Sequence, residues 1–333
     1  MEIRAIVILD QGKPEQQAMR AVVFDTELRF RTDVELRQPV SGEVIVDVVK
    51  AGICETDLQL CKGYMGFSGT LGHEFVGIAR SGRFAGGRVV GEINCACHVC
   101  NMCRRQLSNH CPNRTVIGIV AHDGAFADSV IVPDQNLHAI PDHVTDNDAV
   151  FVEPVAAACR IAEQIQLAGG EVITVLGDGR LGNLCAQVLR HQGCQVRVVG
   201  KHDFKLEILK RLQIPTIQLE NLQPRRDSDI VVDCTGSPTG LTTALQLVRP
   251  CGTIVLKTTV AADQTLHMAP FVIDEIKLIG SRCGPFAAAI ELLRSRAISV
   301  EPLLTATYPL EAAATAFEHA VRKDALKVVF KVR

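Results

Sequence analysis

From about residue 150 onward the sequence alternates between short apolar strands and helical segments, and this alternation restricts the fold more than any other feature. The stretch "EVITVLGDG" leads into "RLGNLCAQVLRHQG", and further strand candidates are "CQVRVVG", "SDIVVDCTG", "GTIVLKT" and "IKLIG". Runs of β-branched residues that alternate with helical periods indicate a parallel sheet covered on both faces. We therefore predict an α/β fold that contains a doubly wound parallel sheet.

The first strand of this region ends in a glycine-rich turn, "VLGDGRLG", which places Gly177, Gly179 and Gly182 in the pattern G-x-G-x-x-G, with Arg180 and Leu181 before the third glycine. The first glycine allows a tight bend, the second lets the backbone approach a diphosphate, and the third lets helix and strand pack closely. Because a strand precedes the turn and a helix follows it, we predict a Rossmann dinucleotide-binding site at these residues.

The end of the next strand, "VRVVGKHDFK", indicates which dinucleotide binds. An acidic residue there would hold the ribose 2′-hydroxyl of NAD, whereas this chain has Gly200 followed by Lys201 and His202, with Lys205 beyond. Gly200 leaves space, and the cations are suited to a 2′-phosphate. The pattern favours NADP(H) over NAD(H). The alternative is that Lys201 and Lys205 are only solvated residues at a helix start.

The first part of the chain follows a different period. Residues 20–50 contain "AVVFD", "LRFR" and "GEVIVDVVKAG", in which apolar positions recur at every second residue. This alternation predicts a β-rich domain. We place the boundary at 149/150, where the period changes. Residues 1–18 are either an added edge strand or an extension, because "MEIRAIVIL" repeats the character of "MRAVVFD" from Met19.

Bulk composition excludes several classes of function. The chain has 333 residues, 47% of them hydrophobic, which is enough for two cores. A formal net charge of −2 offers no field for nucleic acid or an acidic membrane surface. No apolar stretch reaches about eighteen uncharged residues, and the first residues do not resemble a secretory signal. We expect a soluble, cytoplasmic protein with no nucleic-acid or membrane partner.

Four of the thirteen cysteines cluster in "CACHVCNMCRRQLSNHC", with Cys97, Cys100, Cys103 and Cys111 at gaps of two, two and seven residues. Four thiolates at such spacing can close a tetrahedron around zinc and leave no open position for a substrate, so we predict a structural zinc site. The alternatives are free thiols, an iron-sulfur cluster and a nucleic-acid-binding ribbon. An odd total of cysteines without a signal peptide argues against a disulfide framework.

Taken together, the motifs resemble those of the zinc-dependent medium-chain dehydrogenases/reductases, the alcohol, polyol and threonine dehydrogenase group. "GICETDLQ", "LGHEFVG", "CHVCNMC" with Cys111, "VEPVAAACR" and "VLGDGRLG" appear in the family's order. The resemblance implies a GroES-like catalytic domain formed by residues 1–149 and 281–333, with a zinc lobe at about 92–114. It also implies a Rossmann domain at 150–280 and assembly into a homodimer or homotetramer through the edge of the Rossmann sheet.

The resemblance also assigns the catalytic residues. It implies that Cys54 and His73 bind a catalytic zinc, that Glu74 lies beside the metal as a ligand in some states, and that Glu153 completes the shell as in polyol-type members. Asp57 would then fix the tautomer of His73. Such a site would make two zinc ions per chain and leave one position open for substrate oxygen. Taken singly, His73 is more typical of a buried structural histidine and Glu153 of a helix-start carboxylate.

Three positions bear on proton release and cofactor binding. Thr56 matches the hydroxyl with which the family begins its proton relay, but this chain has Gln59 near the place where relatives end the relay with histidine. Glutamine does not act as an acid or base near neutral pH, so water or the cofactor ribose would carry the proton out. Lys327 matches a basic position that contacts the cofactor diphosphate in relatives. The alternative for Lys327 is an exposed lysine at a strand edge.

Our leading hypothesis is an enzyme that transfers a hydride between NADP(H), or NAD(H), and an alcohol, a polyol or the corresponding carbonyl compound. The intact set of Cys54, Thr56, Asp57, His73 and Glu153 favours it. One alternative is a zinc-stabilised, non-catalytic NADPH-binding sensor or structural protein, suggested by Gln59 and by Glu55. Another is a reductase without catalytic zinc.

Overall fold

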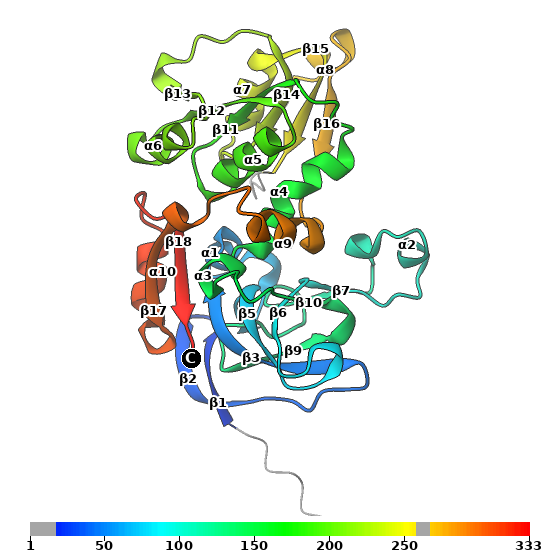
Figure 1. The fold of residues 1–333 in the computed structure, drawn as a ribbon, viewed down its shortest axis with the longest axis vertical. Helices are drawn as coiled ribbons and strands as arrows, with labels where there is room; N and C mark the ends of the chain where they lie inside the picture. Colours follow the sequence, from blue (N-terminus) through cyan, green and yellow to red (C-terminus); the bar gives the residue numbers. More distant parts are fainter. Residues whose placement is uncertain (1–17, 258–266) are drawn as a thin grey trace, which may run out of the picture.

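The computed structural model describes residues 18–257 and 267–333, which form two stacked domains with a small lobe projecting from one side (Figure 1). The expectation for residues 1–18 lies, apart from Ala18, outside the described residues. No helix in the described part of the chain combines the length and the apolar character needed to cross a membrane.

The upper domain in Figure 1 is built on a parallel sheet with the strand order β13-β12-β11-β14-β15-β16. Its strands are β11 (Val172–Leu176), β12 (Gln195–Gly200), β13 (Thr216–Gln218), β14 (Ser228–Asp233), β15 (Val248–Leu256) and β16 (Lys277–Gly280). The order steps outward from β11 in both directions, so the chain reverses its winding between β13 and β14. The predicted doubly wound sheet is therefore confirmed.

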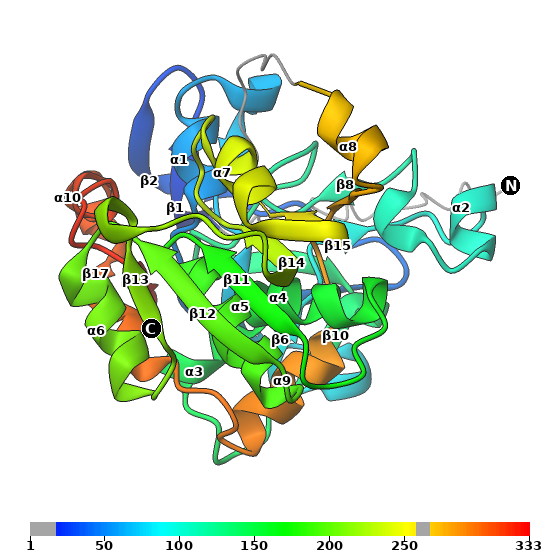
Figure 2. The same ribbon diagram turned by 90° about the horizontal axis from the view of Figure 1, so that it is seen from above.

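Helices cover both faces of this sheet, as the view from above shows (Figure 2). They are α4 (Val152–Gln164), α5 (Arg180–His191), α6 (Asp203–Arg211), α7 (Gly240–Leu247), α8 (Ala269–Ile273) and α9 (Phe286–Arg294), with a 3-10 turn η5 (Leu219–Asn221). Successive strand residues point to opposite faces: Val198 packs with the α4, α5 and α9 layer, whereas Val199 packs with α7. Because both faces are buried, the strands are continuous apolar runs.

The lower domain is β-rich. A seven-stranded sheet follows the path β10-β6-β5-β3-β18-β17, with β9 paired to β3, and a second sheet has the order β2-β1-β4. The strands are β1 (Ala18–Phe24), β2 (Leu28–Glu35), β3 (Glu43–Gly52), β4 (Gly69–Thr70), β5 (Glu74–Ala79), β6 (Arg88–Gly91), β9 (Ser129–Pro133), β10 (Leu137–Ala139), β17 (Leu304–Pro309) and β18 (Lys327–Lys331). Phe126, Phe317 and Phe330 meet in its core, with two of the three ring pairs packed edge to face.

The end of the chain returns to this domain, because β18 pairs with β3 and β17. Within residues 281–333, however, α9 packs against the core of the parallel-sheet domain, so the predicted boundary at 280/281 stays a prediction. Short helices complete the domain: α1 (Glu55–Leu60), α3 (Asp146–Ala149), α10 (Ala313–Ala320), and the 3-10 turns η1 (Tyr64–Gly66), η2 (Gly82–Phe84), η4 (Asp134–Asn136), η6 (Glu301–Leu303) and η7 (Leu310–Ala312). The projecting lobe holds β7 (Asn94–Cys95), α2 (Asn101–Arg104), η3 (Ser108–His110) and β8 (Thr115–Val116).

Candidate active site

Cys54, His73 and Glu74 form a buried cluster between the two domains. Cys54 is the N-cap of α1, two residues beyond the end of β3, and His73 directly precedes β5. Because β3 and β5 pair with Gly52 opposite Glu74, residues nineteen positions apart in sequence meet. One ligand atom of each lies within 4.8 Å of the other two, and His73 and Glu74 are buried. A thiolate, an imidazole and a carboxylate suit zinc.

Asp57 sets the electrostatics of this cluster. Its Oδ1 lies 3.3 Å from Nδ1 of His73, and its Oδ2 accepts the backbone N–H of Cys54 at 2.8 Å. Burial acts to lower the pKa of His73, but the negative charges of Asp57 and Cys54 raise it well above its usual value. Burial likewise raises the pKa of Cys54, and the His73 cation outweighs it and lowers that pKa to about 7. The cluster therefore stabilises a thiolate beside an imidazolium oriented by Asp57, and a metal cation that replaced the imidazolium proton would stabilise the same thiolate.

Several atoms of the cluster have no hydrogen-bond partner among the described residues. They include Nδ1 of His73, which faces the Asp57 carboxylate, and both carboxylate oxygens of Glu74, which face the Lys327 ammonium and the Arg180 guanidinium. Buried polar atoms are normally paired, and those that are not call for an explanation such as an ion. Here those charged neighbours account for the atoms, so the fit to the zinc implied by the motifs rests on the donor set: a thiolate, an imidazole and a carboxylate whose ligand atoms lie within 4.8 Å of one another.

Glu153 stays outside this cluster. It is the second residue of α4, and its carboxylate is not among the atoms that lie within 4.8 Å of one another. Burial raises the pKa of Glu153, and the nearby His73 charge acts in the opposite direction. The structure thus brings Cys54, His73 and Glu74 together and leaves Glu153 as a neighbour, so its role as a ligand remains a prediction.

Lys327 is not an exposed lysine, and that alternative is wrong. Its side chain is 0% exposed, its ammonium forms an ion pair with the Glu74 carboxylate, and Nζ lies 5.5 Å from the centre of the Phe151 ring. Gly52 provides the space, because a Cβ there would lie 2.4 Å from Cε of Lys327. Burial lowers the pKa of Lys327 to about 8. The ammonium faces Glu74 rather than solvent, and the predicted diphosphate contact is untested.

A cavity of about 630 Å³ lies between the domains, and Cys54 is one of the residues that line it. It is lined by Thr56 and Gln59 on α1, by residues 179–181 of the glycine turn, by residues 234–236, by Lys257, and by residues 320–322, 325, 326 and 328. The Thr56 hydroxyl lies 3.8 Å from the Cys54 sulfur, and the Gln59 amide donates to Glu55 at 2.7 Å. The cavity is large enough for a cofactor and a small substrate to meet at Cys54.

Each of the three positions in the turn requires or tolerates glycine for a different structural reason. Gly177 has φ +109°, and a Cβ there would lie 2.6 Å from the carbonyl oxygen of Cys234. A Cβ at Gly182 would lie 2.0 Å from the carbonyl oxygen of Gly177. A Cβ at Gly179 would meet no atom within 4 Å, and Gly179 is the N-cap of α5. The first and third glycines are required for packing, and the second leaves the helix N-terminus open to an anion.

Arg180, the first residue of α5, reaches across to the other domain. Its guanidinium donates to the carbonyl oxygens of Ile53 at 3.1 Å and Leu326 at 3.0 Å, and lies 3.9 Å from Glu74. Leu181 lines the cavity beside it. Arg180 therefore joins the glycine turn to the Cys54 cluster, a role that the sequence pattern did not indicate.

At the end of β12, Lys201 is exposed, whereas Lys205 is buried and lines the cavity. Burial lowers the pKa of Lys205, although the charges of Asp178 and Asp324 oppose that effect. Sequence reasoning missed Asp178, whose side chain contacts Lys201 and His202. The only signal for it was its position between the first two glycines.

Lys257 is a second residue that sequence reasoning missed. It follows β15, lines the cavity, and donates to the Ser281 hydroxyl at 3.1 Å, to the Arg282 carbonyl at 3.3 Å and to the Ala157 carbonyl. These bonds hold the α4 and α9 sides of the cleft together. Its place at the carboxyl end of a parallel strand is where ligands of such sheets bind.

The four cysteines of the lobe converge. The Sγ atoms of Cys100 and Cys103 lie 3.5 Å apart, those of Cys100 and Cys111 3.7 Å, and those of Cys111 and Cys97 3.5 Å. Zinc with Zn–S bonds of about 2.3 Å holds tetrahedral sulfurs roughly 3.8 Å apart. All thirteen cysteines are unbridged. Cys95 turns its thiol to the Ile93 carbonyl, so it stays outside this set.

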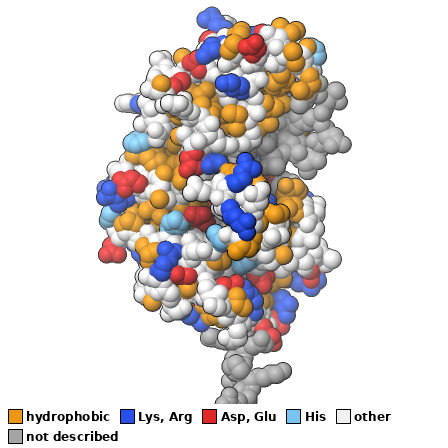
Figure 3. Space-filling view, turned by 90° about the vertical axis from the view of Figure 1, so that its right-hand side faces the viewer, with side chains coloured by type: hydrophobic (Ala, Val, Ile, Leu, Met, Phe, Trp, Pro, Cys, Tyr) orange, Lys and Arg blue, Asp and Glu red, His pale blue; other side chains and the backbone are white. Residues whose placement is uncertain are grey.

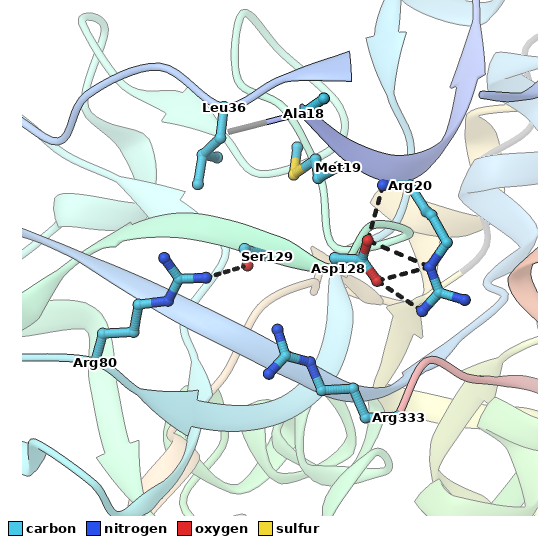
Figure 4. Close-up of a pocket in the computed structure, with 8 residues that line it drawn as sticks. All are labelled: Ala18, Met19, Arg20, Leu36, Arg80, Asp128, Ser129 and Arg333. Carbon is cyan, nitrogen blue, oxygen red and sulfur yellow. Dashed lines mark hydrogen bonds and ion pairs between the residues drawn. The ribbon is translucent and has the colours of Figure 1, made fainter. Parts of the chain in front are cut away.

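A second cavity, of about 280 Å³, lies in the β-rich domain and holds three arginines (Figure 4). Arg20 pairs with Asp128 and Glu311, and Arg80 and Arg333 both pair with Asp47. Because each guanidinium already has a carboxylate partner, this cavity is not a preformed anion site.

Comparisons with known proteins agree with this geometry. Residues 40–142 match the family model for the alcohol dehydrogenase GroES-like domain, and residues 181–295 match that for zinc-binding dehydrogenases. The chain is 29% identical over 301 residues to the 2-dehydro-3-deoxy-L-galactonate 5-dehydrogenase of Pseudoalteromonas atlantica, covering 84% of this chain and 88% of that protein. It is 26% identical to the sorbitol dehydrogenase of Halalkalibacterium halodurans, covering 89% and 94%.

The fold has solved counterparts as well. An alcohol dehydrogenase of Escherichia coli CFT073, solved in complex with NADH, superposes with a TM-score of 0.85 at 25% identity and covers 94% of this chain and 99% of that one.

Proposed function

Since the chain belongs to the zinc-dependent medium-chain dehydrogenase/reductase family and is an oxidoreductase of the alcohol dehydrogenase type, we propose that it oxidises a polyol-like secondary alcohol, or reduces the matching carbonyl, with a nicotinamide dinucleotide. The observation that carries this proposal is the shared cavity, in which the Cys54 end and the glycine turn face the same space. A polyol-like substrate is favoured because one relative is a sorbitol dehydrogenase and another acts on a sugar acid.

We propose that Cys54 and His73 hold a catalytic zinc, with Glu74 beside it, and that Cys97, Cys100, Cys103 and Cys111 hold a structural one. When bound, zinc supplies Lewis-acid polarisation of the substrate oxygen, and the nicotinamide ring supplies the hydride acceptor or donor. The alcohol loses a hydride and a proton overall. The protein's own contribution is the dry, buried setting, the imidazole oriented by Asp57 and the placement of both reactants.

The Thr56 hydroxyl lies 3.8 Å from the Cys54 sulfur and lines the same cavity, so in this proposal it passes the proton outward. Gln59 follows one helical turn later, but its amide is bonded to Glu55 and does not titrate. The proton therefore leaves Thr56 to water or to the cofactor ribose in this proposal. Lys327 offsets the charge of Glu74, which keeps a buried carboxylate beside the metal ionised.

We also propose that two copies associate through β16. This strand is the edge of the described parallel sheet, and Leu278 on it is 41% exposed, beside Val272 and Ile273 of α8 at 76% and 78%. Exposed apolar side chains are visible on the upper part of the face shown in Figure 3. An unpaired edge strand with apolar neighbours is suited to pairing with a second copy of itself.

The test is an activity assay in which the change in nicotinamide absorbance reports turnover. It is run with NAD and with NADP over a panel of alcohols, polyols, hydroxy amino acids and aldehydes. A zinc chelator should abolish activity. Cys54→Ala should lower kcat/KM by at least about a hundredfold, since a polarising metal contributes several kcal/mol to the barrier. Its zinc content should fall from two ions per chain to one while the fold survives.

Cys61→Ser is the matched control. Cys61 is the C-cap of the same helix, and burial raises the pKa of its thiol to about 11, so it is a neutral packing group. This variant should keep its zinc and its activity. Full activity in Cys54→Ala, or turnover that is indifferent to the chelator, would overturn the proposed zinc chemistry.

A further inference from the structure

Asp178 is a charged residue for which the proposed chemistry has no use. It stands between the first two glycines of the turn and is only 7% exposed. Its Oδ2 accepts the backbone N–H groups of Lys201 at 2.7 Å and His202 at 2.6 Å. Nδ1 of His202 lies 3.2 Å from both carboxylate oxygens. The carboxylate is therefore fixed at the point where β12 ends and α6 begins.

The Asp178 side chain leaves no room for a side chain at position 200. A Cβ at Gly200 would lie 2.5 Å from Cβ of Asp178 and 2.6 Å from its Oδ2. The Asp178 side chain thus fills the space that a side chain at position 200 would occupy. In Rossmann folds an acidic residue at the end of this second strand accepts the ribose 2′-hydroxyl of NAD. Here the carboxylate reaches the same place from the neighbouring β11 turn.

We propose that Asp178 determines the choice of nicotinamide cofactor and makes the enzyme prefer NAD(H) to NADP(H). This inference rests on the proposed function and replaces the preference for NADP(H) that the sequence suggested. That preference depended on the lack of an acid after "VRVVG". The structure supplies one from a different strand.

Two physical effects act against a 2′-phosphate. First, Asp178 accepts the backbone N–H groups of Lys201 and His202 at the end of β12, the strand end that holds the ribose in Rossmann folds, so neither donor is free for a 2′-phosphate. Second, a phosphate placed there would face a fixed carboxylate, and like charges a few ångströms apart repel strongly. The exposed Lys201 and the buried Lys205 reduce this repulsion, but the Lys205 ammonium already interacts with the charge of Asp178.

The experiment compares the dissociation constants of NADH and NADPH, from nucleotide fluorescence, and kcat/KM for both cofactors. Asp178→Asn is isosteric, and its amide oxygen can still accept both N–H groups, so the variant removes mainly the charge. We expect the wild-type protein to prefer NADH, and Asp178→Asn to shift the ratio toward NADPH by about tenfold or more, the size expected for one close charge pair.

Asp203→Asn is the matched control, because Asp203 is an exposed carboxylate on the first turn of α6 that bonds Gln218 at 2.5 Å. It removes the same charge and should leave the ratio unchanged. A second variant, Asp178→Gly combined with Gly200→Asp, moves the carboxylate across the gap and should keep the preference for NADH. This double variant keeps the test decisive if Asp178→Asn does not fold.

Different failures separate the two proposals. A wild-type preference for NADPH, or a ratio that Asp178→Asn leaves unchanged, overturns the role of Asp178 while the dehydrogenase assignment stands. Folded protein that binds neither nucleotide overturns the proposed function, and the role of Asp178 with it.

Discussion

At the scale of single residues, partners from distant parts of the chain decide how the charged groups of the cleft behave. Asp57 orients His73, and Lys327 neutralises Glu74. The motifs predicted the first pair but not the second, because "GHEF" and "GICETD" are local patterns, whereas Lys327 is more than two hundred residues from Glu74. Nothing in a β-strand lysine indicates which carboxylate it will meet.

Asp128 also depends on a partner that is distant in sequence, Arg20, and this pair leads to a prediction about stability. Burial acts to raise its pKa, but the hydrogen bonds from Arg20 outweigh it and lower that pKa. The guanidinium of Arg20 is 37% exposed and the Asp128 side chain 22%, so solvent screens the pair. Asp128→Asn should lower the free energy of unfolding by about 1 kcal/mol at pH 7, as measured by urea denaturation.

The sign of the pH dependence follows from the direction of the shift. A carboxylate whose pKa is lower in the folded than in the unfolded state stabilises the fold above its unfolded pKa of about 3.9, and loses that effect as pH falls through the folded pKa. The difference between wild type and Asp128→Asn should therefore shrink below about pH 4. Asp33→Asn, at an exposed pair with Arg31, should not change stability. Equal stability of Asp128→Asn and wild type at pH 7 would contradict the role of this pair.

At the scale of elements, the projecting lobe stands out because packing between its helices and strands does not explain how it keeps its shape. It has two short strands, one four-residue helix and a 3-10 turn, and α2 has no buried residue. Such a segment buries too little apolar surface to hold itself together. The converging thiols of Cys97, Cys100, Cys103 and Cys111 are the feature that can order it once metal is bound.

Cys103→Ser should therefore remove one zinc ion per chain and lower the melting temperature by about 5 °C or more, because metal binding to such a site contributes directly to folding. Zinc content by atomic absorption and a thermal melt measure both effects. NADH binding should persist, since the glycine turn belongs to the other domain. Cys95→Ser, outside the cluster, should retain both zinc ions. Unchanged zinc content in Cys103→Ser would contradict the proposed structural site.

At the scale of the whole molecule, the two domains are joined at the point where chemistry is proposed. Arg180 starts α5, the helix that follows the glycine turn, and donates hydrogen bonds to the carbonyl oxygens of Ile53 and Leu326, next to Cys54 and Lys327. Lys257 ties the strand end of the parallel sheet to α4 and to the segment before α9. Residues of both domains line the cavity, so it forms only when the two domains pack together.

A substitution at Leu278 on β16 tests the proposed association of two copies. We expect the wild-type protein to be a dimer or tetramer by light scattering coupled to size exclusion, and Leu278→Lys to give a smaller species, because a lysine on an edge strand disfavours strand pairing. Val40→Lys introduces the same charge at a residue that is also exposed but lies before β3. It should leave the mass unchanged. A monomeric wild-type protein would rule out this interface.

The sequence by itself determined the features that depend on neighbours along the chain. The alternating period predicted the doubly wound sheet, the glycine pattern predicted the turn, and the cysteine spacing predicted a cluster that the structure brings together. Each follows from residues within one strand, turn or loop, where φ, ψ and spacing restrict the outcome.

Only the tertiary structure decided which charges meet. It placed Lys327 against Glu74, extended Arg180 to the carbonyl of Ile53, kept Glu153 outside the ligand cluster and set Asp178 in the space left by Gly200. The physical reason is that electrostatic contacts depend on distance in space, which strand order and domain packing set and which no local pattern contains. Asp178 shows the consequence, because the acid missing from the end of one strand is provided by the turn beside it.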